Sequence, residues 1–212
     1  GDASLRLLDG EAGVAAVRDR VVAAGRDVAE AVRDADPAHA LAALDAHRLL
    51  CGHRSGPFGV APWSRSAVAW LTADVPGFVP EGEAYPGRPV MMTANRPELG
   101  LYNGDTGVVV AAGGPPQAWF SVGGVPQAFS PFVLDGLTSV HAMTVHKAQG
   151  SQFRDVSVVL PPAGSPLLTR ELLYTAVSRA KESVLLVGDE AAISQAIARP
   201  ARRMSGLTAR LR

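Results

Sequence analysis

The sequence predicts an α/β domain built on a parallel sheet with helices on both faces, interrupted by a small antiparallel β module. Short and almost wholly apolar runs, RLLC near Leu49 and DVSVVL near Val156, alternate with helical segments, as is typical of strands buried on both faces. Residues 85–135 are instead rich in glycine and proline between short runs, which is typical of antiparallel strands joined by turns. We therefore expect a helical connecting segment (1–45), one α/β domain in two parts (46–84 and 136–212) and an inserted module (85–135).

Composition limits the possible partners and compartments. Twenty basic and 20 acidic residues give zero net charge, so nucleic-acid binding would require a local basic patch. No apolar run approaches the ~18 residues of a membrane span, and the first residues lack the pattern of a signal peptide. The single cysteine, Cys51, cannot form an internal disulfide and is expected to be a buried hydrophobe. These features predict a cytoplasmic protein that does not enter a membrane.

The first 45 residues predict two helices. Val14, Val17, Val21 and Val28 recur at helical spacing, with Gly25 as a weak point in the pattern. An Asp-Pro pair at positions 36 and 37 then opens a second helix, because aspartate caps a helix and proline suits its first position. We expect this segment to connect or pack against the α/β domain.

The α/β pattern begins with RLLCGH at residues 48–53, which predicts a buried strand. A polar turn containing Arg54 follows, and a helix from Pro62 carries Trp63, Ala67, Trp70 and Leu71 on one face. In residues 85–135, four or five short runs predict the antiparallel strands, and Pro131 in the last run indicates an edge strand.

After residue 139 the α/β pattern resumes. The sequence predicts a short strand ending near Met143, a polar helical turn over 144–150, and the strand DVSVVL. A helix over 169–181 and the strand SVLLVG follow. LLVGDE looks like a magnesium-binding segment, but we expect Asp189 to cap the final helix. Arginines in the tail favour a solvated end over a DNA patch: Arg199, Arg202, Arg203, Arg210 and Arg212.

Two segments carry the residues most suited to chemistry. Thr144, His146 and Lys147 lie at a strand-to-helix junction, where hydroxyl, imidazole and ammonium groups can bind phosphate oxygens. A lone histidine such as His146 is also commonly structural. The polar loop continues through residues 149–152, where Gly150 allows close backbone approach.

Arg179 ends the predicted helix on the face opposite its apolar stripe. Its planar, permanently charged fork suits stabilisation of a phosphoryl transition state. The alternative is an arginine that only complements the dipole at the end of a helix.

The residues of these segments and their order along the chain resemble a known family. TVHKAQGSQF followed by LYTAVSRAK resembles motifs V and VI of superfamily 1 helicases, and HRLLCGHRSGPFGV resembles motif IV. YPGRPVMMTANRPELGLYNGDTGVVV resembles the SH3-like insertion of the RecD-like branch, which includes alpha subunits of exodeoxyribonuclease V. The resemblance covers roughly residues 44–190.

The resemblance implies the second RecA-like domain of an ATP-dependent DNA helicase that moves 5′ to 3′ and serves double-strand break repair by homologous recombination. ATP and Mg²⁺ would be held mostly by a first RecA-like domain, because this chain has no GxxxxGK(S/T) phosphate loop. The chain alone is therefore expected to be inactive. Other implied partners are single-stranded DNA and RecB- and RecC-type subunits.

The resemblance also assigns roles to individual residues. Arg54 and Arg179 would reach the γ-phosphate, with Gln149, Gly150 and Gln152 near the nucleotide. Thr144, His146 and Lys147 would hold the DNA backbone without reading sequence. Trp119 and Phe120 of the module would either stack on a base or fill a small core.

One position departs from the family pattern. The family usually has a glutamate where this chain has Gln152, so a role that needs a negative charge is in question there. Two alternatives remain open: a non-catalytic interaction module of a nuclease-helicase complex, and a stand-alone single-strand DNA binder.

Overall fold

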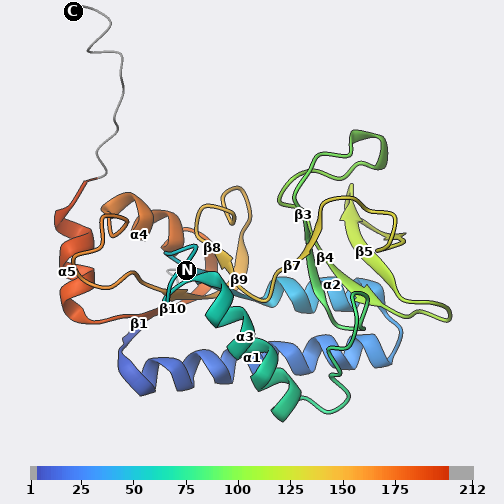
Figure 1. The fold of residues 1–212 in the computed structure, drawn as a ribbon, viewed down its shortest axis with the longest axis horizontal. Coiled ribbons are helices and arrows are strands. Elements are labelled where there is room, and N and C mark those ends of the chain that lie inside the picture. Colours follow the sequence, from blue (N-terminus) through green and yellow to red (C-terminus); the bar gives the residue numbers. More distant parts are fainter. Residues whose placement is uncertain (1–3, 201–212) are drawn as a thin grey trace, which may run out of the picture.

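The computed structural model describes residues 4–200 and consists of two sheets placed side by side (Figure 1). The parallel sheet has the order β1-β10-β9-β2-β8, and all its pairings are parallel. Its strands are β1 (Ser4–Leu8), β2 (His47–Cys51), β8 (Met143–Thr144), β9 (Phe153–Val159) and β10 (Ala180–Val187). The predicted parallel and antiparallel sheets are both confirmed, but the antiparallel sheet extends past the predicted boundary at residue 135, because Leu137–Ser139 pairs with its strand Pro89–Met92.

Strand β1 is absent from the sequence prediction, which assigned only helices to residues 1–45. Ser4 to Leu8 pair with Ser183 to Val187 at one edge of the parallel sheet. The strand has one neighbour, and Leu5 is 54% exposed, so it lacks the buried apolar run that marked the central strands. Long-range pairing, rather than local pattern, makes this segment a strand. Residues 4–8 therefore belong to the parallel sheet.

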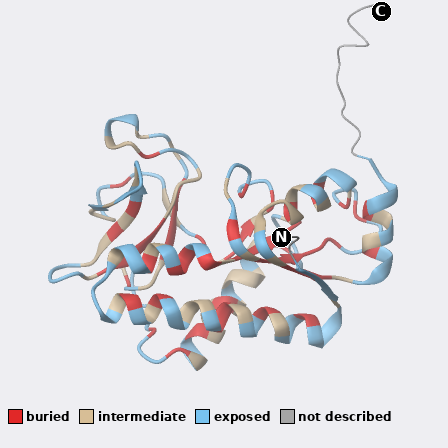
Figure 2. Cartoon of the chain, turned by 180° about the vertical axis from the view of Figure 1, so that it is seen from behind, coloured by how far each residue is buried: buried red, intermediate tan, exposed pale blue. Residues whose placement is uncertain are grey.

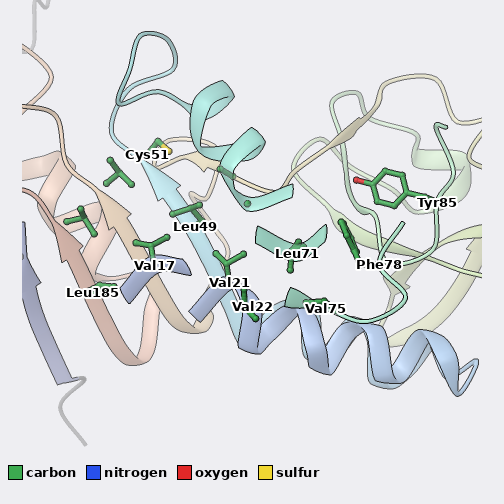
Figure 3. Close-up of a cluster of buried hydrophobic side chains, with 14 residues drawn as sticks. Val17, Val21, Val22, Leu49, Cys51, Leu71, Val75, Phe78, Tyr85 and Leu185 are labelled. Atoms are coloured by element: carbon green, nitrogen blue, oxygen red, sulfur yellow. The ribbon is translucent and has the colours of Figure 1, made fainter. Parts of the chain in front are cut away.

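Helices cover both faces of the parallel sheet. Helices α1 (Gly10–Arg33) and α3 (Val60–Asp74) cover one face, where Val17 and Val21 of α1 meet Leu49 and Leu185 of the sheet (Figure 3). Helix α4 (Arg170–Val177) covers the other face through Leu172 and Ala176. Alternate residues of β2 enter the two cores, because successive side chains of a strand point to opposite faces.

Gly25 lies inside an unbroken α1 rather than at a weak point. A Cβ atom built on Gly25 would lie 2.1 Å from Cδ2 of Leu71 on α3. The absence of a side chain therefore lets α1 and α3 approach closely. Packing between the helices offsets the low helix propensity of glycine.

Cys51 at the end of β2 is fully buried, as predicted. Burial raises the pKa of its thiol to about 12, because a thiolate is poorly solvated in this core. The residue acts as a small hydrophobic group.

The antiparallel sheet has the order β6-β5-β4-β3-β7. Its strands are β3 (Pro89–Met92), β4 (Thr106–Val110), β5 (Gln117–Val122), β6 (Val125–Phe129) and β7 (Leu137–Ser139), with a 3-10 turn, η1 (Pro97–Leu99), between β3 and β4. Strand β6 is an edge strand, as predicted, but it ends at Phe129 and so excludes Pro131. Proline cannot donate to a strand ladder.

Helix α2 (Pro37–Ala46) joins the two sheets. It packs with α1 against Val108 and Val110 of β4, and Figure 2 shows buried residues along this inner side of the helices. The predicted cap is present, since the Asp36 carboxylate accepts a hydrogen bond from the His39 N–H at 3.0 Å.

Trp119 and Phe120 fill cores. Phe120 is 1% exposed inside the module, and Trp119 packs against the α1–α2–β4 cluster. The Phe120 side chain is therefore not available for stacking on a base in this structure, whereas Trp119 is only half-buried.

The last helices differ from the prediction at one boundary. Helix α4 ends at Val177, and Ala180 already begins β10, so the predicted helix over 169–181 is too long. Pairing of Ala180 with Phe153 of β9 draws this segment into the sheet. Helix α5 (Glu190–Ala198) begins as predicted, with the Asp189 carboxylate accepting from Ala192 N–H at 2.6 Å. Of the tail arginines, Arg202, Arg203, Arg210 and Arg212 lie outside the described residues.

Tyr85 and His141 join the two connections between the sheets. The Tyr85 hydroxyl lies 2.7 Å from Nε2 of His141, and the two rings are stacked. Burial, assisted by Arg88, lowers the pKa of His141 to about 4. Burial and Arg20 lower the pKa of His47 to about 3.

Across residues 4–200, no helix is both long and apolar enough to cross a bilayer.

Replacing Leu49 by alanine should lower the free energy of unfolding by about 2–5 kcal/mol, because it leaves a cavity in a packed core. Leu49 is 1% exposed, whereas Leu5, which is 54% exposed, provides a matched Leu→Ala control expected to lose much less. Urea unfolding followed by circular dichroism measures both variants. Equal losses would contradict the assignment of Leu49 to the core.

Stability should fall on acidification between about pH 6.5 and 3. The unfolded chain binds protons at histidine near the ordinary pKa of 6.5, whereas buried His141 and His47 bind them only near pH 4 and 3. Their contribution is therefore complete above pH 6.5 and is lost as the pH falls. Urea unfolding at several pH values should show a smaller pH dependence for His141→Gln than for the parent chain. An unchanged dependence would contradict burial of a neutral imidazole.

Candidate functional site

The carboxyl ends of β2 and β8 lie next to each other. Cys51 pairs with Thr144, so the chain leaves both strands at the same edge of the sheet. Arg54 follows β2 by three residues, and His146 and Lys147 follow β8. Arg54, His146 and Lys147 are exposed, while Thr144 is half-buried. The structure thus collects a hydroxyl, an imidazole and two cationic groups at this carboxyl edge.

A tight turn after β8 directs these groups outward. The Thr144 carbonyl accepts from the N–H groups of Lys147 at 3.0 Å and Ala148 at 3.3 Å, and the Thr144 hydroxyl oxygen also accepts from Lys147 N–H. Val145 and Ala148 are buried and anchor the turn, while His146 and Lys147 face solvent. Among the described residues, neither His146 nor Lys147 forms an ion pair. These groups therefore remain available to an anionic ligand.

The loop after this turn runs to the opposite edge of the sheet. Cys51 pairs with Val159 at the end of β9, whereas the loop enters β9 at Phe153, six residues earlier. At about 3.3 Å per residue the two edges lie roughly 20 Å apart. Gln149, Gly150 and Gln152 are exposed on this loop, and Gly150 adopts a positive φ of 90°, which glycine accepts without strain.

Arg179 lies at the amino edge, in the turn between α4 and β10. This placement corrects the prediction that it belongs to the helix itself. Its Nη1 donates to the Ser151 carbonyl at 3.0 Å, Nε donates to the Thr175 carbonyl at 3.1 Å, and Nη2 donates to the Ser178 hydroxyl at 3.0 Å. The Arg179 carbonyl also accepts from Phe153 N–H at 2.8 Å. Arg179 therefore joins the end of the loop to the end of α4.

The hydrogen bonds of Arg179 do not cancel its charge. All three acceptors are neutral, and the described residues place no carboxylate in an ion pair with it. A guanidinium carries five N–H groups, two on each terminal nitrogen. With one acceptor on each of Nη1 and Nη2, one N–H on each nitrogen remains for a ligand. Two remaining N–H donors on a fixed cation suit contact with phosphate oxygens.

The structure separates Arg54 from Arg179. The two arginines were predicted to meet one phosphate, but Arg54 follows the carboxyl end of β2 and Arg179 precedes the amino end of β10. The parallel sheet places these ends on opposite edges. Within this domain Arg54 groups with Thr144, His146 and Lys147 instead.

The buried guanidinium of Arg48 packs against Phe153 at the amino edge of the sheet. Arg48 is 3% exposed, and its guanidinium carbon lies 4.7 Å from the centre of the Phe153 ring. Burial lowers the pKa of Arg48 to about 10, and Asp45 opposes that shift. Cation–π contact thus steadies the residue at which the loop enters β9. Neither Arg48 nor Ser178 was predicted to contribute to the site, and nothing in the local pattern of β2 distinguishes Arg48 from a solvated arginine.

The residues present differ in their fit to the predicted cofactors. Arg179 and the loop before β9 have the donors that a phosphate group requires. In residues 4–200, however, no group of three histidine, cysteine, aspartate or glutamate side chains is placed to hold a metal ion. We therefore assign no Mg²⁺ ligand to this part of the chain.

The chain is similar in sequence to known helicase proteins. Residues 139–187 match the UvrD-like helicase C-terminal domain, a range that includes the β8 turn, the loop and Arg179. The RecBCD enzyme subunit RecD of Mycobacterium tuberculosis is 52% identical over 172 residues, covering 81% of this chain and 30% of that protein. The RecD subunit of Mycolicibacterium smegmatis is 48% identical over 196 residues, covering 92% and 35%.

A third relative is named as a helicase. The ATP-dependent RecD2 DNA helicase of Deinococcus radiodurans is 34% identical over 153 residues, covering 72% of this chain and 21% of that protein. The chain thus spans about a third or less of the length of these three relatives. Their sequence similarity and the matched C-terminal domain show that the chain belongs to the RecD-like helicases of superfamily 1.

Proposed function

We propose that this chain supplies the second motor domain of an ATP-dependent DNA helicase that moves 5′ to 3′ on single-stranded DNA. In this proposal Arg179 contacts the γ-phosphate of ATP, and the turn after β8 holds the DNA backbone. The observation that carries the proposal is the bonding of Arg179, which is fixed by three neutral acceptors and retains two N–H groups and its charge.

The amino edge is the proposed nucleotide side. Arg179 would stabilise charge that develops on the transferred phosphoryl group, and such an arginine typically contributes 10³–10⁵ in rate. Gln149, Gly150 and Gln152 lie on the loop that Arg179 holds, which supports the proposal that their polar groups are near the same ligand. The phosphate loop and Mg²⁺ ligands would come from a first RecA-like domain of the parent protein, so this chain alone is expected to be inactive.

The carboxyl edge is the proposed DNA side. Thr144, His146 and Lys147 offer donors that can grip phosphates without distinguishing bases. Arg54 lies at this edge, so we now propose a DNA-backbone contact for it in place of the γ-phosphate contact. The resulting patch is local, in keeping with a chain of zero net charge.

One loop connects the two sides. The residues between β8 and β9 begin at the DNA-side turn and end at Ser151, whose carbonyl accepts from Arg179. If Arg179 moves toward a nucleotide, the position of Ser151 changes with it. This continuity supports coupling between ATP hydrolysis and movement along DNA.

The relatives suggest the setting of the parent protein. Two of them are named as RecBCD subunits, so we propose RecB- and RecC-type partners and a role in double-strand break repair by homologous recombination. The RecD2 relative is named as a helicase by itself. Size measurement of the purified parent with and without RecB- and RecC-type subunits distinguishes these settings.

Replacing Arg179 by alanine in the parent protein should lower the rate of DNA-stimulated ATP hydrolysis by at least 10³-fold, because transition-state charge loses its partner. Binding of a non-hydrolysable ATP analogue should change by less than about tenfold. Arg33→Ala, at an exposed arginine of α1, provides the control. Equal losses of binding and hydrolysis would contradict the transition-state role. Unchanged hydrolysis would refute any role for Arg179 in the reaction.

Replacing Lys147 by alanine should weaken binding of single-stranded DNA by the parent protein and lower its salt dependence. One lost phosphate contact reduces the slope of log affinity against log salt by about 0.7. Lys181→Ala is a matched control, because Lys181 is the only other lysine and lies at the amino edge. Fluorescence anisotropy with oligonucleotides of two sequences should show equal weakening. Equal effects at both lysines would contradict the assignment of DNA to the carboxyl edge.

A further inference from the structure

We propose that Ser178 is a positioning residue that orients Arg179 for contact with the nucleotide. This inference rests on the proposed function of Arg179 and concerns a residue that the sequence analysis did not single out. Ser178 is the C-cap of α4 and keeps a helical backbone conformation, with φ −69° and ψ −2°. The side chain of Ser178 therefore projects beside the last turn and next to Arg179.

The Ser178 hydroxyl forms two hydrogen bonds of opposite sense. It donates to the Thr175 carbonyl at 3.0 Å and accepts from Nη2 of Arg179 at 3.0 Å. A hydroxyl has one donor and two acceptor lone pairs, so both bonds coexist. The donated bond fixes the direction of the oxygen, and the fixed oxygen then receives the guanidinium.

Thr175 completes this arrangement. Its carbonyl accepts from the Ser178 hydroxyl and also from Nε of Arg179 at 3.1 Å. Two nitrogens of the guanidinium are therefore held by the last turn of α4, while Nη1 reaches across to Ser151. Three contacts from three different residues define both the position and the plane of the guanidinium.

Ser178 is a neutral hydrogen-bond partner for the Arg179 guanidinium, which would act on the nucleotide through its charge. A carboxylate in place of Ser178 would hold the guanidinium more strongly but would compensate its charge before a phosphate arrived. A hydroxyl orients the group and leaves the charge in place. Preorganised charge is more effective than charge that must reorient during the reaction. Ser178 thus combines orientation with electrical neutrality.

The test compares Ser178→Ala with Ser178→Thr in the full-length parent protein. Threonine keeps the hydroxyl, so it should retain most of the DNA-stimulated ATP hydrolysis, whereas alanine should lower kcat by about tenfold. Affinity for a non-hydrolysable ATP analogue should remain within about twofold in both variants. Ser194→Ala, at an exposed serine of α5, should match the parent protein.

Three outcomes would overturn the role of Ser178: unchanged kcat in Ser178→Ala, equal loss in both Ser178 variants, or a loss of nucleotide affinity that accounts for the lower rate. Arg179→Ala is measured in parallel. If Arg179→Ala abolishes hydrolysis while Ser178→Ala does not slow it, the positioning inference alone fails. If Arg179→Ala leaves hydrolysis unchanged, the proposed function of Arg179 fails and the inference fails with it.

Discussion

The parallel pairing of β2 with both β8 and β9 is the constraint on which the rest of this structure depends. The chain leaves the parallel sheet after α3, forms an entire antiparallel sheet, and then returns to pair beside the strand it left. Because the strands run in one direction, every junction that follows a strand lies at one edge and every junction that precedes a strand lies at the other. This rule places Thr144 and Arg54 together and keeps Arg179 apart from them.

The loop between β8 and β9 is the short physical link across that separation. Its first residues form the exposed turn with His146 and Lys147, and its end is bound through the Ser151 carbonyl to Arg179. Buried Val145 and Ala148 anchor the first part of the loop. Buried Phe153, whose ring contacts the Arg48 guanidinium, anchors its end. A segment anchored at both ends transmits displacement better than a free loop. That property suits a motor that must relate a nucleotide to a nucleic acid.

The sequence predicted the features that depend on local chemistry. The apolar strands β2, β9 and β10, the caps at Asp36 and Asp189, and the antiparallel module all follow from local patterns. It missed β1, and it extended α4 into residues that belong to β10, because both outcomes depend on pairing with distant strands. The site followed the same division. The residue types were recognised, but the opposite placement of Arg54 and Arg179 is a property of the sheet.

Hydrogen–deuterium exchange of the parent protein tests the separation of the two edges most directly. Single-stranded DNA alone should slow exchange at residues 53–56 and 144–148, whereas a non-hydrolysable ATP analogue alone should slow it at residues 149–153 and 178–181. Amides that the strands already protect serve as internal references. Protection of the same edge by both ligands, or a reversed assignment, would contradict the account.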